Sequence, residues 1–159
     1  KLCWFKINRP CEFYAATLTK HTENLEVDVI LKGQGAVKAR LMEIQAMQKP
    51  TAKEEGVYDA LMLVNEMMLR GIGVLPVDIR KSGAATYGVE DGKLRLPFLA
   101  IQGCGENAAF RLKEVIDAGD YICVDDIQKQ SGLNSTVMEK LTEMGVFKDI
   151  PQSAQMSLF

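Results

Sequence analysis

The sequence is poor in the residues that build metal sites. None of its four cysteines belongs to a Cys-x-x-Cys pair, and the single histidine, His21, completes no ligand cluster, so no metal site is indicated. We interpret the cysteines as small buried thiols in a reducing environment. Long apolar runs and a signal peptide are also missing, which predicts a cytoplasmic protein without a membrane partner.

A strong charge of either sign is missing too. The formal net charge of −2 at pH 7 excludes a protein that coats nucleic acid by bulk electrostatics, so any such contact must be local. Clustered carboxylates of the kind that hold two metal ions for phosphoryl transfer are not evident. The sequence therefore predicts no catalytic residue, metal or cofactor within this chain. Because Lys1 is followed at once by apolar residues, we expect the chain to be part of a longer protein.

Helical periodicity dominates the first half of the chain. Helices are expected from Pro10 through Ala16, over 33–47 and after Pro50, with a link over 21–32. Thr51 and Glu54 form a capping box for the third of these helices, which ends at Arg70-Gly71. Its Met-rich face is interpreted as core packing, with a partner-binding groove as the alternative.

Residues 76–98 change to a period of two. Val77 and Ile79 alternate with polar neighbours and predict a strand. Further on, Asp91-Gly92 is a two-residue hairpin turn, across which Tyr87 and Val89 face Leu94 and Leu96. Arg80, Lys81 and Ser82 lie between these strands as a solvated loop or, alternatively, a phosphate contact. The expected fold is mainly α with a small β-hairpin element.

The Gly103-Cys104-Gly105 turn opens a helix that should end near Ala118-Gly119 and carries its apolar face at Ala109, Leu112 and Ile116. Two glycines let the backbone turn tightly, and the unpaired N–H groups at the start of the helix suit an anion such as phosphate. The alternative is a Gly-rich link between two packed helices.

A second helix pair follows as a pseudo-repeat that lacks the second glycine. Asp125 or Asp126 caps a helix through Ile127, and the chain turns at 131–134. Thr136 and Glu139 then fit another capping box, for a helix that ends at Gly145.

The chain closes with Gln155, Met156, Ser157, Leu158 and Phe159. Large apolar side chains at a terminus make sense where a partner supplies the pocket. The alternative is that they fold back onto this domain.

In this order, the pieces resemble the C-terminal end of the bacterial PolC-type DNA polymerase III alpha subunit, over essentially all 159 residues. The segments that carry the resemblance are Trp4-Phe5-Lys6, Glu12-Phe13-Tyr14-Ala15-Ala16, Leu25-Glu26, Lys32-Gly33, Ala39-Arg40, Asp91-Gly92, Leu96-Pro97-Phe98, Ile101-Gln102-Gly103-Cys104-Gly105 and the final Gln155-Met156-Ser157-Leu158-Phe159.

The resemblance implies four regions: a helical end of the fingers (1–72), a β-hairpin element (73–100), a tandem helix-hairpin-helix module (101–148) and a flexible tail (149–159). The module would hold duplex DNA by its backbone, without reading its sequence. The implied DNA-binding residues are Gly103, Cys104, Gly105, Asn107, Arg111 and Lys113. The implied sliding-clamp ligand is 155–159. Catalytic carboxylates and Mg²⁺ would belong to the palm of the parent polymerase, so this part should be inactive alone.

Two departures weaken the implied DNA contact. Gln102 stands where such hairpins often have Pro, and Glu106 places an acid beside the proposed phosphate site. Residues 101–148 carry five Lys and Arg against eight Asp and Glu, a net charge of −3, whereas residues 1–100 carry +2. Two other functions stay open: a non-enzymatic DNA-binding or repair module, and a domain that binds only proteins.

Overall fold

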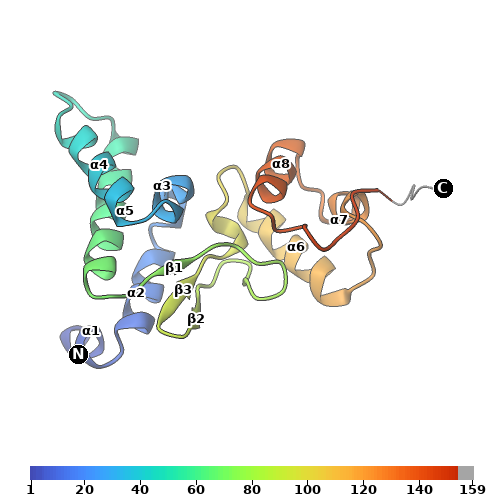
Figure 1. The fold of residues 1–159 in the computed structure, drawn as a ribbon, viewed down its shortest axis with the longest axis horizontal. Coiled ribbons are helices and arrows are strands. Elements are labelled where there is room, and N and C mark those ends of the chain that lie inside the picture. Colours follow the sequence, from blue (N-terminus) through green and yellow to red (C-terminus); the bar gives the residue numbers. More distant parts are fainter. Residues whose placement is uncertain (154–159) are drawn as a thin grey trace.

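The chain passes from a group of helices, through a small sheet, to a second group of helices (Figure 1). The structure is a computed structural model, and it describes residues 1–153. The predicted fold class, mainly α with a small β element, is confirmed. No helix among the described residues is long and apolar enough to cross a membrane.

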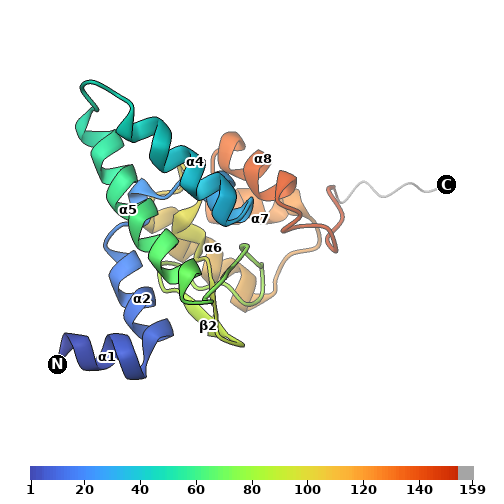
Figure 2. The ribbon, with the colours of Figure 1, turned by 60° about the vertical axis from the view of Figure 1, so that its left-hand side comes forward.

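The first group begins with α1 and α2, and Pro10 occupies the first turn of α2 as expected. The predicted link over 21–32 contains one 3₁₀ turn, η1, and the short helix α3. Figure 2 shows α4 and α5, which pack against each other. The bounds are α1 (Leu2–Asn8), α2 (Pro10–Thr19), η1 (Thr22–Asn24), α3 (Val27–Leu31), α4 (Gln34–Gln45) and α5 (Ala52–Leu69).

The capping box of α5 is confirmed. The Glu54 N–H donates to Thr51 Oγ1 at 3.3 Å, and the Thr51 N–H donates to Glu54 Oε2 at 2.7 Å. Met67 is fully buried on the core side of α5, which confirms core packing at that position. The helix ends before Gly71, whose φ of 82° is left-handed.

The sheet has three short strands in the order β1-β3-β2, with bounds β1 (Val74–Leu75), β2 (Gly88–Glu90) and β3 (Lys93–Arg95). Strand β3 pairs antiparallel with β2 and parallel with β1. The Asp91-Gly92 hairpin is confirmed, since Val89 pairs with Leu94 and both turn residues have positive φ.

The strand predicted at Val77 and Ile79 is wrong. Strand β1 lies two residues earlier and stops before Pro76, which has no N–H to give to the sheet. After Pro76 the chain instead forms a tight turn, in which the Ser82 N–H donates to the Asp78 carbonyl.

The second group follows a 3₁₀ turn, η2 (Phe98–Ala100), and consists of α6 (Glu106–Ala118), α7 (Val124–Ser131) and α8 (Ser135–Glu143). The expected end of α6 is confirmed, with Gly119 in the left-handed region. The first helix pair is therefore a single 3₁₀ turn followed by α6, whereas the second is two true helices.

Two predicted caps in this group are wrong. Helix α8 begins one residue before Thr136, and its cap is Asn134, whose Oδ1 accepts from the Val137 N–H at 2.8 Å. Helix α7 starts after Cys123, so Asp126 lies within its first turn and accepts from the Ile122 N–H at 3.2 Å.

Buried side chains from both helical groups and the sheet form one continuous core. A polar link crosses it, because Thr22 Oγ1 and Tyr87 Oη lie 3.1 Å apart and both residues are buried. The prediction of buried thiols is confirmed for Cys104 and Cys123 and wrong for Cys3, which is exposed.

Candidate nucleic-acid interface

The two hairpins of the second helical group repeat the same backbone geometry. A shift of 29 residues places Gly103 on Gly132, and both have left-handed φ, of 89° and 69°. The same shift places Gly105 on Asn134, the residues that precede α6 and α8, with φ and ψ of −74° and 160° against −73° and 160°. The predicted pseudo-repeat is thus a repeat of conformation.

The middle residue of each turn points into the core. Cys104 and its counterpart Leu133 are both buried, and burial raises the pKa of the Cys104 thiol to about 11. The Cys104 N–H donates to the Ile101 carbonyl at 3.0 Å. Cys104 therefore shapes the first turn by packing, and its own N–H is already used.

Open donors remain in the first turn of α6. Within the described part of the chain, no side chain caps this helix, and its first backbone bond is Ala109 N–H to the Gly105 carbonyl. The N–H groups of Glu106, Asn107 and Ala108 therefore face outward. In α8 the Asn134 side chain takes the equivalent donor, so the two hairpins differ in how much N–H they offer.

A basic side chain from each motif lies beside the hairpin of the other. Lys140 Nζ lies 3.2 Å from the Gln102 carbonyl and 3.3 Å from Gln102 Oε1. The residue equivalent to Lys140 is Arg111, whose Nη1 would lie 3.8 Å from a Cβ on Gly132. Of the predicted cations, Arg111 is thus brought to the second hairpin, not the first.

Lys113, the other predicted cation, pairs with Asp117 along α6, with Nζ and Oδ1 3.0 Å apart. Residues two apart on a helix do not share a face, so Lys113 does not add to Arg111. Gly103, Gly105 and Asn107 are exposed at the first hairpin, as the sequence-based assignment requires.

The first hairpin also has an acidic neighbour that the sequence did not indicate. Residues 99–106 line a surface depression together with Thr22, Glu23 and Leu25. Glu23 belongs to η1, which packs against η2, so it comes to the hairpin through long-range folding. The negative charges of Glu23 and Glu106 therefore repel an anion at this hairpin.

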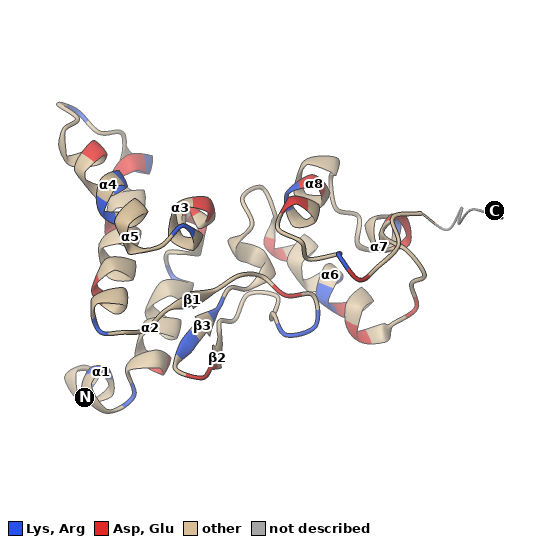
Figure 3. Cartoon of the chain, viewed as in Figure 1, with Lys and Arg blue, Asp and Glu red and all other residues tan. Residues whose placement is uncertain are grey.

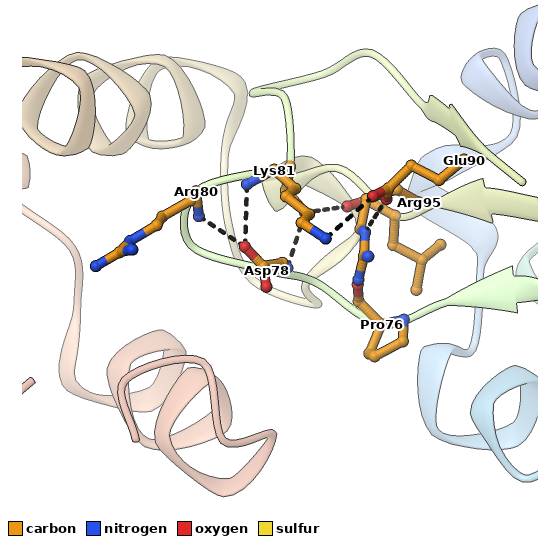
Figure 4. A network of polar contacts seen from close by, with 8 residues as sticks. Pro76, Asp78, Arg80, Lys81, Glu90 and Arg95 are labelled. Atoms are coloured by element: carbon orange, nitrogen blue, oxygen red, sulfur yellow. Dashed lines mark hydrogen bonds and ion pairs between the residues drawn. The ribbon is translucent and has the colours of Figure 1, made fainter. Parts of the chain in front are cut away.

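The loop after β1 is held by a polar network (Figure 4). Asp78 Oδ1 accepts from the N–H groups of Arg80 and Lys81 at 2.9 and 3.0 Å. Burial acts to raise the pKa of Asp78, but these N–H groups and the nearby Arg95 charge lower it overall. Ser82 is fully buried and donates to the Leu96 carbonyl at 2.6 Å. The solvated-loop interpretation is therefore wrong for Ser82.

Arg80 and Lys81 are both exposed, and Figure 4 shows the Arg80 side chain pointing away from the network. Lys81 lies 3.5 Å from Glu90, which also pairs with Arg95. Arg95 in turn donates to the Pro76 carbonyl at 3.0 Å. The network fixes the backbone that carries Arg80.

Acidic and basic residues are interspersed over the second helical group (Figure 3). The predicted clamp ligand, Gln155, Met156, Ser157, Leu158 and Phe159, lies outside the described residues.

The paired hairpins define the class of this protein. The family model described as "Helix-hairpin-helix motif" matches residues 71–156, just over half of the chain, so the chain belongs to the helix-hairpin-helix family.

Similar proteins indicate a narrower group than this motif alone. The chain is similar over its whole length to DNA polymerase III PolC-type of Thermotoga maritima, at 32% identity over 159 residues and 12% of that protein. The polymerase of the same name from Streptococcus thermophilus is 33% identical over 162 residues, or 11% of its length, and that of Streptococcus pyogenes is 32% identical. The resemblance to PolC-type polymerases is thus confirmed. The chain spans about one-eighth of the length of these relatives.

Proposed function

We propose that this chain belongs to a PolC-type replicative DNA polymerase, in which it holds duplex DNA by the phosphate backbone and tethers the enzyme to its sliding clamp. The observation that carries the DNA contact is the uncapped start of α6 at the first hairpin. Three outward N–H groups at a helix amino end, where the helix dipole is positive, form a site that suits a phosphate.

The remaining contacts position the duplex and do not read its sequence. Arg111 supplies charge at the second hairpin, and Arg80 offers a further cation from the braced loop. Glu23 and Glu106 weaken the first site. The interface therefore works when the rest of the polymerase delivers the duplex, and it contributes position more than affinity.

Nucleotidyl transfer itself is proposed for the parent polymerase. Mg²⁺ would act there, because polymerase chemistry uses carboxylate-held metal ions. Among residues 1–153, no three His, Cys, Asp or Glu side chains are grouped closely enough to hold a metal ion. The described residues thus do not fit the metal, and no catalytic step is assigned to them.

Contact with the rest of the polymerase is proposed at α1. Five of its seven residues are apolar, and none of the seven is buried. Leu2 is 75% exposed, Ile7 72% and Trp4 57%. A helix that is apolar on all sides is normally covered by protein, which suits packing against another part of the same enzyme.

A duplex titration tests the DNA contact. The 159-residue chain should bind short duplexes weakly, without sequence preference, and with a shallow salt dependence that reflects a few phosphates. Arg111→Ala should lower the salt slope by about 1. Arg9→Ala removes the same charge between α1 and α2 and serves as the matched control. Undetectable binding at low salt by folded protein would favour the protein-binding function that the acidic second helical group also suits.

Deletion of Leu158 and Phe159 tests the clamp contact. The truncated chain should keep its fold and lose its affinity for the cognate clamp, because these are the largest apolar side chains of the pentapeptide. Equal clamp affinity before and after the truncation would remove the pentapeptide from the proposal.

A further inference from the structure

The chain that leaves α8 stays on the folded domain instead of departing from it. Gly145, with φ of 73°, turns the chain after the helix, and Val146 and Phe147 are then buried. Ile150 packs against the core, and its N–H donates to the Phe147 carbonyl at 3.0 Å. The segment after α8 is therefore directed across the module toward α7.

This segment ends by capping α7 with its own backbone. The Pro151 carbonyl accepts from the Val124 N–H at 2.9 Å, and the Gln152 carbonyl accepts from the Asp125 N–H at 3.3 Å. No side chain caps α7 from Cys123, the residue before the helix. Two donors that a helix start leaves unpaired are thus satisfied by the C-terminal segment, two and three residues before Ala154.

We infer that the amino end of α7 is an anchor that fixes where the clamp-binding pentapeptide leaves the protein. This inference rests on the proposed clamp contact. Gln155 follows Gln152 by three residues, and three residues span at most about 10 Å. Helix α7 has eight residues, so its far end, at the second hairpin, lies about 12 Å away. The chain between the anchor and Gln155 is therefore much shorter than a flexible tail that begins at residue 149, as the sequence predicted, would be.

A short tether has a measurable consequence for binding two partners at once. A protein that holds duplex DNA through its hairpins and the clamp through its pentapeptide gains affinity according to the effective concentration of the second site. That concentration falls roughly as the −3/2 power of tether length once the tether exceeds the span. The anchor thus sets the clamp close to the duplex-binding hairpins without adding a contact to either partner.

Val124→Pro removes one anchoring donor while keeping the helix. Val124 is the first residue of α7, a position where Pro is favoured because its missing N–H is not used inside the helix. Cys123, which precedes it, has φ of −145° and ψ of 172°, the extended backbone that Pro requires of its neighbour. Val124→Ala keeps the N–H, also reduces the buried side chain, and is the control for lost packing.

A second variant lengthens the tether and leaves the anchor untouched. Eight Gly and Ser residues inserted after Ser153 place Gln155 eleven residues beyond Gln152 instead of three, which changes the effective concentration of the second site. The measurement compares the affinity of each chain for the clamp alone with its affinity for the clamp assembled on duplex DNA, at low salt. Amide hydrogen exchange at Val124 and Asp125 follows the anchor in the same complexes.

The expected result is an unchanged affinity for the clamp alone in every variant. The gain on clamp-loaded duplex should change with the insertion, and it should differ between Val124→Pro and Val124→Ala. Equal gains in all four proteins, or free exchange of the Val124 and Asp125 amides in the clamp-bound chain, would overturn the anchor. A wild-type chain that does not bind the clamp alone would instead overturn the proposed clamp contact, and with it the use of the anchor.

Discussion

Gly105→Ala separates the binding role of the first hairpin from its folding role. Gly105 has φ of −74° and ψ of 160°, a conformation that any residue adopts. A Cβ built there meets no atom within 4 Å. The added methyl group therefore enters open space beside the first turn of α6, where a phosphate would approach the outward N–H groups.

The expected cost to folding is small. Gly is a moderately good residue before a helix and Ala a poor one, so the substitution should lower the free energy of unfolding by about 0.5–1 kcal/mol. Gly35→Ala is the matched control, because a Cβ there also meets nothing within 4 Å and the residue lies inside α4. It should raise stability by about 0.5–1 kcal/mol.

The expected cost to binding is larger. A hydrogen bond to a charged group contributes about 1.5–3 kcal/mol, so one lost N–H contact to phosphate weakens duplex binding about tenfold to a hundredfold. Fluorescence anisotropy with a short labelled duplex at low salt measures the affinity, and urea unfolding measures the stability. Gly35→Ala should bind as the wild type does.

Unchanged duplex affinity in folded Gly105→Ala would refute this account of the first hairpin. Gly103→Ala cannot replace it as a test, because Gly103 has φ of 89°. A side chain in that left-handed region costs about 1–2 kcal/mol by itself, so lost binding would be confounded with lost folding.

Three further predictions concern folding and titration. Thr51→Ala should lower stability in urea unfolding by about 1 kcal/mol and Thr51→Ser should not. The Thr51 N–H, which both variants keep, and the Thr51 hydroxyl both lower the pKa of Glu54. The part of the difference that comes from the hydroxyl bond to the carboxylate should therefore be present above pH 4.5 and fade as pH falls through the lowered pKa, while the part from the Glu54 N–H bond to Thr51 Oγ1 remains. Burial raises the pKa of Tyr87 from 10.0 to about 12, against the opposing effect of the Thr22 hydrogen bond. The stability that the neutral Tyr87 side chain contributes should therefore be complete below pH 10 and lost as pH rises toward 12. Tyrosinate absorbance follows the titration, and Tyr87→Phe should lack this step. At pH 8 iodoacetamide should modify the exposed Cys3 rapidly. It should modify Cys104, whose thiol has a pKa of about 11, only after unfolding. Early alkylation of Cys104 in mass spectra would contradict its burial.

Local chemistry made several elements predictable. The Thr51–Glu54 box and the Asp91-Gly92 turn are complete within a few residues, so the sequence contains all the groups that form them. The strand at Val77 and Ile79 failed because alternation describes burial, not pairing. Both side chains pack on the core. The backbone, however, turns from Asp78 to Ser82, and the Asp78 N–H donates to Ser82 Oγ and not to a neighbouring strand.

The cap of α8 was missed for a different reason. Asn134 and Thr136 are both acceptable caps, and the Glu139 position favoured the later one. The repeat decides between them, because aligning Gly103 with Gly132 places Asn134 at the position of Gly105. Glu23 and Lys140 could not be assigned to the first hairpin from sequence, since each reaches it from an element distant in the chain.

The two hairpins have the same backbone but differ in how many N–H groups they leave unpaired. Their turn glycines and the residues before α6 and α8 match in conformation, so backbone geometry alone would make them equal phosphate sites. Asn134 accepts from the Val137 N–H, whereas Gly105 has no side chain to do so. A glycine before α6 therefore keeps three donors open to a ligand, and an asparagine before α8 uses one of them for the stability of the module. Lys140 of α8 bonds to Gln102 in the first hairpin, so the capped motif supports the turn that has more unpaired N–H groups.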